Sequence, residues 1–202
     1  MAVIDQTRFS GEQDYDPAPG VDIVMPVPVG TSSRVLDGRT LKLIGALHRR
    51  FWSRRRELLQ GRAQMGQGQP TAPAAVSPEI SHLADLTRDD AGTWEGRVAQ
   101  LDAIAQMVDG PESGQVVAIR GWEQTEPGVL VDGRAVPGCI FDLAVAMSLG
   151  ADAFRRERNP FAVVIPEPAD DEETQLWLDL SDLAHDRAGI DRGTVRIATV
   201  HN

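Results

Sequence analysis

Residues 116–122 read VVAIRGW and residues 161–165 read FAVVI, and these two short stretches decide the fold. Both are nearly pure apolar runs, which is typical of parallel strands that are covered on both faces. We expect strands over Val116–Arg120 and Phe161–Ile165, with Pro166 ending the second. Arg120 places a cation at the end of the first run, so the sequence must also supply something for this arginine to pair with or act on.

Helical patterns alternate with these strands. The predicted elements, in chain order, are a strand over 80–86, a helix over 94–108, the strand 116–120, a turn-rich loop or small hairpin over 126–136, a helix over 139–156, the strand 161–165, a helix over 170–188 and a strand over 195–200. Strands separated by helices pair in parallel through right-handed crossovers. The fold class predicted for this region is therefore α/β with a parallel sheet.

The remainder of the chain differs in composition. The predicted parts are an extended, partly disordered N-terminus over 1–38, a helix over 39–65, a linker over 66–78 and the α/β region over 79–202. Apolar residues recur at helical spacing within 39–65, and Gly, Gln and Pro are dense within 66–78. Because Val21–Val29 carries two prolines, we expect it to be at most an extended edge segment.

The charge and composition exclude several classes of protein. The chain has 20 Lys and Arg against 30 Asp and Glu, a net charge of −10, which argues against general nucleic-acid binding. Cys139 is the single cysteine, so neither an internal disulfide nor a cysteine-rich zinc site is expected. No apolar run is long enough to span a membrane and the N-terminus does not resemble a signal peptide, so we expect a cytoplasmic protein.

Three charged residues follow strands that should end at the same edge of the sheet. These are Asp85, Arg120 and Glu167. Functional side chains of parallel α/β proteins gather at the carboxyl ends of the strands. The alternatives are structural: Arg120 can simply pair with an acid, and Asp85 can cap the following loop. For Asp142, inside a predicted helix, we expect a capping role.

The basic run in the predicted N-terminal helix also has two interpretations. Its members are Arg49, Arg50, Arg54, Arg55 and Arg56. They resemble a nucleic-acid patch. On an amphipathic helix of an acidic protein, however, a solvated or salt-bridging face is the better interpretation.

Several segments together resemble the malate synthases, in particular the shorter class with a helical segment before a TIM barrel. The segments are ALHRRFWSRRRELLQGR, LADLTRDDAGTWEG, IRGWE, VDGRAVPGCIFDLAV, VVIPEPADDEETQLW and DRAGIDRGTVRIATV. They occur in the family's order over roughly residues 39–200. The resemblance implies the N-terminal region and first half of a TIM-type β/α barrel. It also implies the family reaction of the glyoxylate cycle, condensation of acetyl-CoA with glyoxylate to give malate and CoA, with Mg²⁺ as cofactor.

The resemblance assigns roles to residues at the strand ends. Arg120 matches the arginine that stabilises the enolate and contacts glyoxylate, a role that suits a permanently charged, planar guanidinium. Asp85, Gly121 and Trp122 match neighbouring substrate-binding positions. The catalytic candidate is therefore Arg120, and the substrate-binding candidates are Asp85, Arg120, Gly121 and Trp122.

The chain also departs from the family pattern. The family's Asp-Phe-Glu-Asp is replaced here by Asp85-Leu86-Thr87-Arg88, its histidine by Glu123 and its lysine by Glu167. Asn202 falls at the position of a magnesium-binding glutamate, and a neutral amide is a poor ligand for a hard dication. We therefore predict no metal site in this chain.

These departures lead to a hypothesis and an alternative. We expect a half-barrel over 79–202 that is not competent for the condensation alone, because it lacks the metal carboxylates, the catalytic base and the second half of the barrel. Its open sheet edges should require oligomerisation or a partner chain. The alternative is a non-catalytic half-barrel paralogue that acts as a partner or regulatory subunit.

Overall fold

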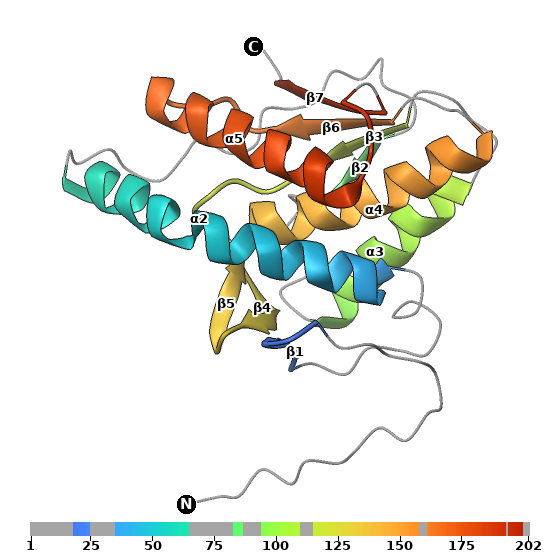
Figure 1. Cartoon of the computed structure of the whole chain (residues 1–202), viewed down its shortest axis with the longest axis horizontal. Helices are drawn as coiled ribbons and strands as arrows, with labels where there is room; N and C mark the ends of the chain where they lie inside the picture. Colours follow the sequence, from blue (N-terminus) through green and yellow to red (C-terminus); the bar gives the residue numbers. More distant parts are fainter. Residues whose placement is uncertain are drawn as a thin grey trace, which may run out of the picture.

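The computed structural model describes residues 18–24, 35–64, 83–86, 94–109, 115–157, 161–192 and 194–199. The helices and strands of these residues are shown in Figure 1. They are β1 (Val21–Ile23), α2 (Gly38–Gln64), β2 (Leu83–Asp85), α3 (Trp94–Asp109), β3 (Gln115–Ala118), β4 (Thr125–Val131), β5 (Arg134–Pro137), α4 (Gly138–Glu157), β6 (Phe161–Ile165), α5 (Asp171–Ala188) and β7 (Val195–Thr199).

A four-stranded parallel sheet forms the centre of the α/β region. Its strand order is β2-β3-β6-β7, and every neighbouring pair is parallel. Val117 on β3 lies opposite Val163 on β6, and both are fully buried. This arrangement confirms the predicted α/β class. Within the described residues the sheet is open, with β2 and β7 at its two ends, which is consistent with the expected part of a β/α barrel.

Helices cover this sheet in two layers. α3 contacts β2 and β3, and α4 contacts β6 and β7, so both pack directly on the strands. α2 lies across α4 and α5, as Figure 1 shows. The imidazole Nε2 of His185, on α5, lies 3.0 Å from the carbonyl oxygen of Val195 and links α5 to β7.

The long helix α2 forms because its apolar residues recur on one side. Leu41, Ile44, Phe51 and Leu58 are buried at spacings of three, seven and seven residues, which follow the helical repeat. Asp37 caps its start, since its Oδ1 accepts from the backbone nitrogen of Thr40 at 2.8 Å and from the Thr40 hydroxyl at 2.9 Å. The apolar spacing thus predicted both the existence and the buried face of this helix.

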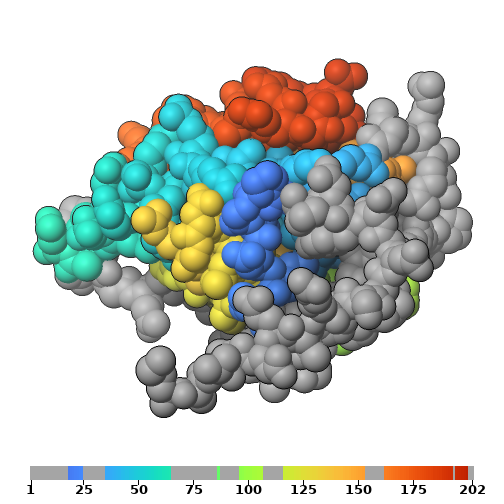
Figure 2. All heavy atoms as spheres, turned by 60° about the horizontal axis from the view of Figure 1, so that its bottom comes forward, coloured from blue at the N-terminus to red at the C-terminus, as the bar shows by residue number. Residues whose placement is uncertain are grey.

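A small antiparallel sheet, β1-β4-β5, lies on the other side of α2. Asp132 and Gly133 form its tight turn with φ angles of 50° and 76°, so the segment expected as a turn-rich loop or hairpin is a hairpin. Arg49 clamps this sheet, because its Nε and Nη2 donate to Asp132 at 2.8 Å and Nη2 also donates to Pro19 O at 2.7 Å. Figure 2 shows β1, in blue, beside the yellow hairpin, with the cyan helix α2 above both.

Some predictions fall outside the described residues. These include the linker over 66–78 and most of the N-terminal part, so the four-part division of the chain stays a prediction. Of the strand expected over 80–86, the structure describes Leu83–Asp85 as β2. None of the described helices is long and apolar enough to cross a bilayer.

The stability of this fold should depend on pH through His48. Its ring is 2% exposed, stacks on Trp52 with 4.9 Å between ring centroids, and has no hydrogen-bond partner at either nitrogen. Burial lowers the pKa of His48 to about 4. Between pH 6.5 and 4 the imidazole of His48 is protonated in the unfolded chain and neutral in the folded chain. The free energy of unfolding should therefore fall by up to about 3 kcal/mol across this range.

Urea denaturation of the wild-type chain and of His48→Leu at several pH values measures this effect. The difference between the two proteins isolates His48 from the carboxylates, which titrate in both. An identical pH dependence for the two proteins would contradict the prediction.

Candidate functional site

The candidate site lies at the carboxyl edge of the parallel sheet. The backbone nitrogen of Ile119 donates to the carbonyl oxygen of Val164 at 3.0 Å, so the pairing of β3 with β6 continues up to Arg120. Asp85 is the last residue of β2 and pairs in register with Ala118. The backbones of Asp85 and Arg120 therefore meet at one edge, as the sequence predicted. The position of the Asp85 side chain lies outside what the structure describes.

Asp142 holds the guanidinium of Arg120 in a fork. Asp142 Oδ2 accepts from Arg120 Nε at 2.9 Å, and Oδ1 accepts from Arg120 Nη2 at 2.7 Å. Oδ2 also accepts from the backbone nitrogen of Arg120 at 3.0 Å. Arg120 is 4% exposed and Asp142 is fully buried. The capping role expected for Asp142 is therefore wrong: it lies inside α4 and its carboxylate is directed at the end of β3.

A second acid and a second arginine extend this pair into a network of four charges. Glu126, on β4, accepts from Arg120 Nη2 at 2.9 Å, and the same oxygen lies 3.2 Å from Nε of Arg97 on α3. The network contains two cations and two anions, so each buried charge has a counter-ion. The sequence did not single out Glu126 or Arg97, because both lie on other elements that only the fold brings to Arg120.

Arg120 remains a cation throughout the accessible pH range. Burial by itself lowers the pKa of its guanidinium, but the neighbouring carboxylates of Asp142 and Glu126 outweigh this effect and raise the pKa above its ordinary value. A fixed positive charge at a strand end can stabilise negative charge that develops on a substrate oxygen. This group cannot act as a base.

Gly138 makes room for the arginine. It is the first residue of α4, and a Cβ atom there would lie 2.8 Å from Nε of Arg120 and 3.1 Å from its Cδ. The backbone nitrogen of Gly138 donates to the carbonyl oxygen of Gln124 at 2.8 Å, which fixes the start of the helix against the loop. Glycine is required at this position because the guanidinium passes directly over the backbone.

The loop that follows Arg120 is held from α2. Nε of Arg55 donates to the carbonyl oxygen of Trp122 at 2.5 Å, and its Nη2 donates to that of Glu123 at 3.2 Å. Trp122 is fully buried and packs against Trp177 with 4.8 Å between ring centroids. The indole is thus a packing anchor, while Gly121 is partly exposed. Whether this loop binds substrate stays a prediction.

Arg62, at the end of α2, pairs with two further acids. Arg62 forms ion pairs with Glu123 and with Glu173, in the first turn of α5. Glu123 stands where the family pattern has histidine, and here it ties the loop to α2. Glu167 is exposed on the loop after β6. The carboxylate of Glu123 is thus paired with Arg62.

The described acids do not form a magnesium site. No three His, Cys, Asp or Glu side chains are grouped for a metal ion among the residues whose side chains the structure describes. Glu126 and Asp142, at the strand edge, both give their oxygens to arginine. Thr87, Arg88 and Asn202 lie outside the described residues. Among the side chains that the structure describes, none therefore forms a ligand set that fits the Mg²⁺ implied by the resemblance.

The salt-bridging interpretation of the basic helix is confirmed at two of its positions. Arg49 pairs with Asp132, and Arg54 pairs with Asp179 at 2.5 Å. Arg55 instead donates to backbone carbonyl oxygens of the loop. A parallel sheet packed under helices, with a buried arginine at its carboxyl edge, defines this chain as an α/β protein with a charged strand-end site.

Comparison with known proteins specifies the family. Residues 115–202 match the family model "Malate synthase, TIM barrel domain". The chain is 25% identical to the glyoxysomal malate synthase of Candida tropicalis over 92% of its own length, which is 45% of that protein. It is 34% identical to the glyoxysomal malate synthase of Glycine max over 71% of its own length and 23% of that protein. A malate synthase of Streptomyces clavuligerus is 26% identical over 91% and 46%.

The chain belongs to the malate synthase family, and it forms a partial barrel, as the resemblance predicted. It spans less than half the length of these relatives. The activity of these relatives is therefore only proposed for this chain.

The ion pair of Arg120 and Asp142 should show strong energetic coupling. Arg120→Met and Asp142→Leu should each lower the free energy of unfolding by about 3 kcal/mol, because each leaves a buried charge without its partner. The double variant should cost clearly less than the sum of the two. Urea denaturation of all four proteins closes the double-mutant cycle.

The exposed pair of Arg54 and Asp179 supplies the matched control. The same cycle on Arg54→Met and Asp179→Leu should show much weaker coupling, since both side chains are more than one third exposed. Equal coupling in the two cycles would show that the burial of Arg120 and Asp142 has no special effect.

Proposed function

We propose that this chain carries the strand-end arginine of a malate synthase-type site and does not condense acetyl-CoA with glyoxylate by itself. The observation that carries the proposal is the guanidinium of Arg120, held by Asp142 at the carboxyl edge of the sheet. The family reaction places negative charge on an enolate oxygen, and a fixed cation lowers the energy of that charge. Because its position is set before any substrate binds, Arg120 needs no rearrangement to act in this way.

The condensation also requires a base to remove a proton from the acetyl methyl group. The described carboxylates nearest Arg120 do not suit this role. Glu126 and Asp142 are buried and accept from arginines, and Glu123 pairs with Arg62. We therefore assign Arg120 the stabilisation of the enolate and assign no base within the described residues. No step is assigned to Mg²⁺.

The open sheet favours a second candidate function, that of a non-catalytic partner or regulatory subunit. In the described part of the chain, β2 and β7 each pair on one side only. A strand edge with unpaired backbone groups is a template for another strand. Under both candidates, we propose that a second copy or a partner chain covers these edges. A cytoplasmic location stays a prediction.

A direct assay tests the catalytic proposal. The purified chain with acetyl-CoA, glyoxylate and Mg²⁺ should release CoA no faster than the reagents alone, as measured with a thiol reagent. Arg120→Lys and Arg192→Ala serve as comparisons, the latter removing an exposed arginine of the loop before β7. Turnover that is lost in Arg120→Lys and kept in Arg192→Ala would show that the chain is competent alone.

The oligomeric state tests the proposed covering of the edges. Sedimentation velocity at micromolar concentration should give a mass of at least twice the 21.9 kDa of one chain. Replacing the inward-facing apolar residue of the edge strand, Ile197→Lys, should weaken this association. A well-folded monomer at the same concentration would refute a self-associating edge.

A further inference from the structure

A groove runs between α5 and β7, at one end of the parallel sheet. It encloses about 500 Å³. Trp177 and Leu178 of α5 border it on one side, and Val195 and Ile197 of β7 border it on the other. Figure 1 shows β7 as the last strand of the sheet, with α5 alongside it. The groove is therefore an apolar hollow next to a strand that pairs on one side only within the described sheet.

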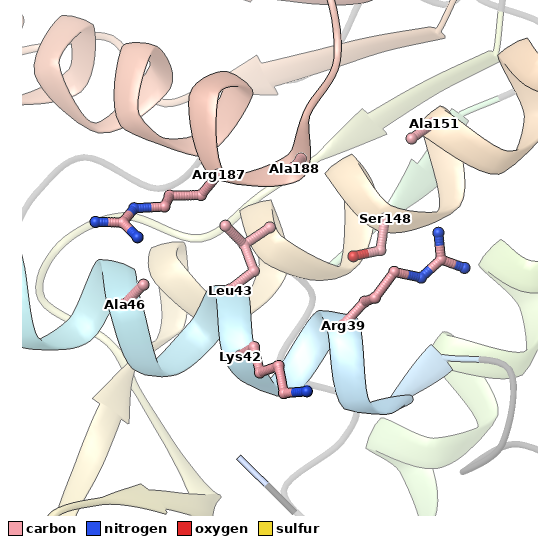
Figure 3. A pocket seen from close by; sticks show the side chains of 8 residues that line it. All are labelled: Arg39, Lys42, Leu43, Ala46, Ser148, Ala151, Arg187 and Ala188. Carbon is pink, nitrogen blue, oxygen red and sulfur yellow. The ribbon is translucent and has the colours of Figure 1, made fainter. Parts of the chain in front are cut away.

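The side of α5 that borders the groove differs from the sides that pack within the chain. α5 contacts α2 and α4, and its residues Leu176 and Leu180 are buried. Figure 3 shows the end of α5 at Ala188, where Leu43 of α2 lines the same hollow between the helices. Leu178 lies nearly opposite to Leu176 and Leu180 around the helix, and it is 56% exposed. An exposed leucine beside an apolar groove forms a surface that a partner can cover.

The charges at the two ends of the groove favour a second copy of the same chain as this partner. Leu178 is the eighth of the eighteen residues of α5, so it lies near the middle of the helix. Asp171 is exposed at the start of α5, on the same side as Leu178. Arg192 lines the groove beyond the end of α5 and is 67% exposed. If two copies of α5 cross antiparallel at Leu178, the acid of each copy approaches the arginine of the other, whereas a parallel crossing brings like charges together.

We propose that a second copy of this chain docks on the groove through a two-fold axis next to Leu178. The two β7 strands then pair antiparallel, edge to edge, and Leu178 of each copy enters the contact. Strands of one sheet lie about 4.8 Å apart, so two helices that each lie over their own β6–β7 pair are roughly 10 Å apart. Packed helices have interaxial distances of about 8–10 Å. The inference rests on the proposed covering of the sheet edges and specifies the edge, the partner and the contact.

This mode of association leaves the strand-end site open. β6 lies between β3 and β7 in the sheet, so Arg120, which follows β3, is not at the paired edge. Because the two β7 strands are antiparallel, the carboxyl edges of the two sheets point in opposite directions. Two half-barrels that closed into one barrel would instead bring both Arg120 residues to the same mouth and would leave Leu178 outside the contact.

Disulfide crosslinking tests the two-fold contact. Leu178→Cys places two identical thiols next to the axis, so mild oxidation at micromolar concentration should convert most of the chain to a covalent dimer on a non-reducing gel. Glu172→Cys carries an exposed thiol at the start of α5, away from the axis, and should give at most one tenth of that dimer. The wild-type chain, whose Cys139 is fully buried, gives the background. Equal yields from Leu178→Cys and Glu172→Cys would overturn the proposal.

Sedimentation of two charged variants separates this contact from other modes of association. Leu178→Asp should weaken dimerisation at least ten-fold, because it removes the apolar contact and places like charges at the axis. Val24→Asp is the matched control, since Val24 is 53% exposed outside the groove, and it should leave dimerisation within two-fold of wild type. Circular dichroism checks that both variants are folded.

The outcomes distinguish this inference from the proposal on which it rests. A dimer of the wild-type chain that is weakened only by Leu178→Asp supports both. A dimer that persists equally in Leu178→Asp overturns the contact at α5 and leaves the covering of the edges by a second copy in place. A monomeric wild-type chain at the same concentration refutes a second copy as the partner.

Discussion

The buried ion pair of Arg120 and Asp142 is the constraint on which the arrangement of the strand edge depends. A guanidinium taken out of water is strongly unfavourable unless its donors are satisfied, and here the same carboxylate accepts from its side chain and its backbone. The pair therefore fixes the end of β3 to α4. Glu126 adds β4 to the same point, and Gly138 is required because any side chain there would collide with the arginine.

The helix α2 acts as a second constraint, because its arginines reach across the layers. Arg55 holds the carbonyl groups of the loop after Arg120, and Arg62 joins Glu123 to Glu173 at the start of α5. A glutamate at position 123 is thus accommodated by a cation from a helix far away in sequence. In this chain the position contributes to the contact between α2 and the barrel, and its carboxylate is not available for chemistry at the edge.

Family membership and chemical competence are separate matters in this protein. Residues 115–202 match the malate synthase TIM barrel domain, and the described strands of this region form a parallel sheet. The acids that surround the arginine serve as its counter-ions. An arginine held in this way keeps its charge and its position, whereas proton transfer needs groups whose oxygens are open to a substrate. This contrast is the reason for proposing a retained scaffold with an incomplete site.

The sequence by itself determined the elements of this fold. The apolar runs around Val117 and Val163 predicted a parallel sheet, the spacing from Leu41 to Leu58 predicted α2, and the place of Arg120 after its strand predicted the edge on which it lies. These properties depend on local pattern, since the spacing of apolar residues along a short segment determines which face of a strand or helix is buried.

Only the tertiary structure decided which partners these residues take. Asp142 was expected to cap a helix and instead holds Arg120, while Arg97 and Arg62 gave no sign of their roles. Ion pairs join side chains that lie far apart along the chain, so charge type and spacing alone cannot specify them; the packing of helices on the sheet does.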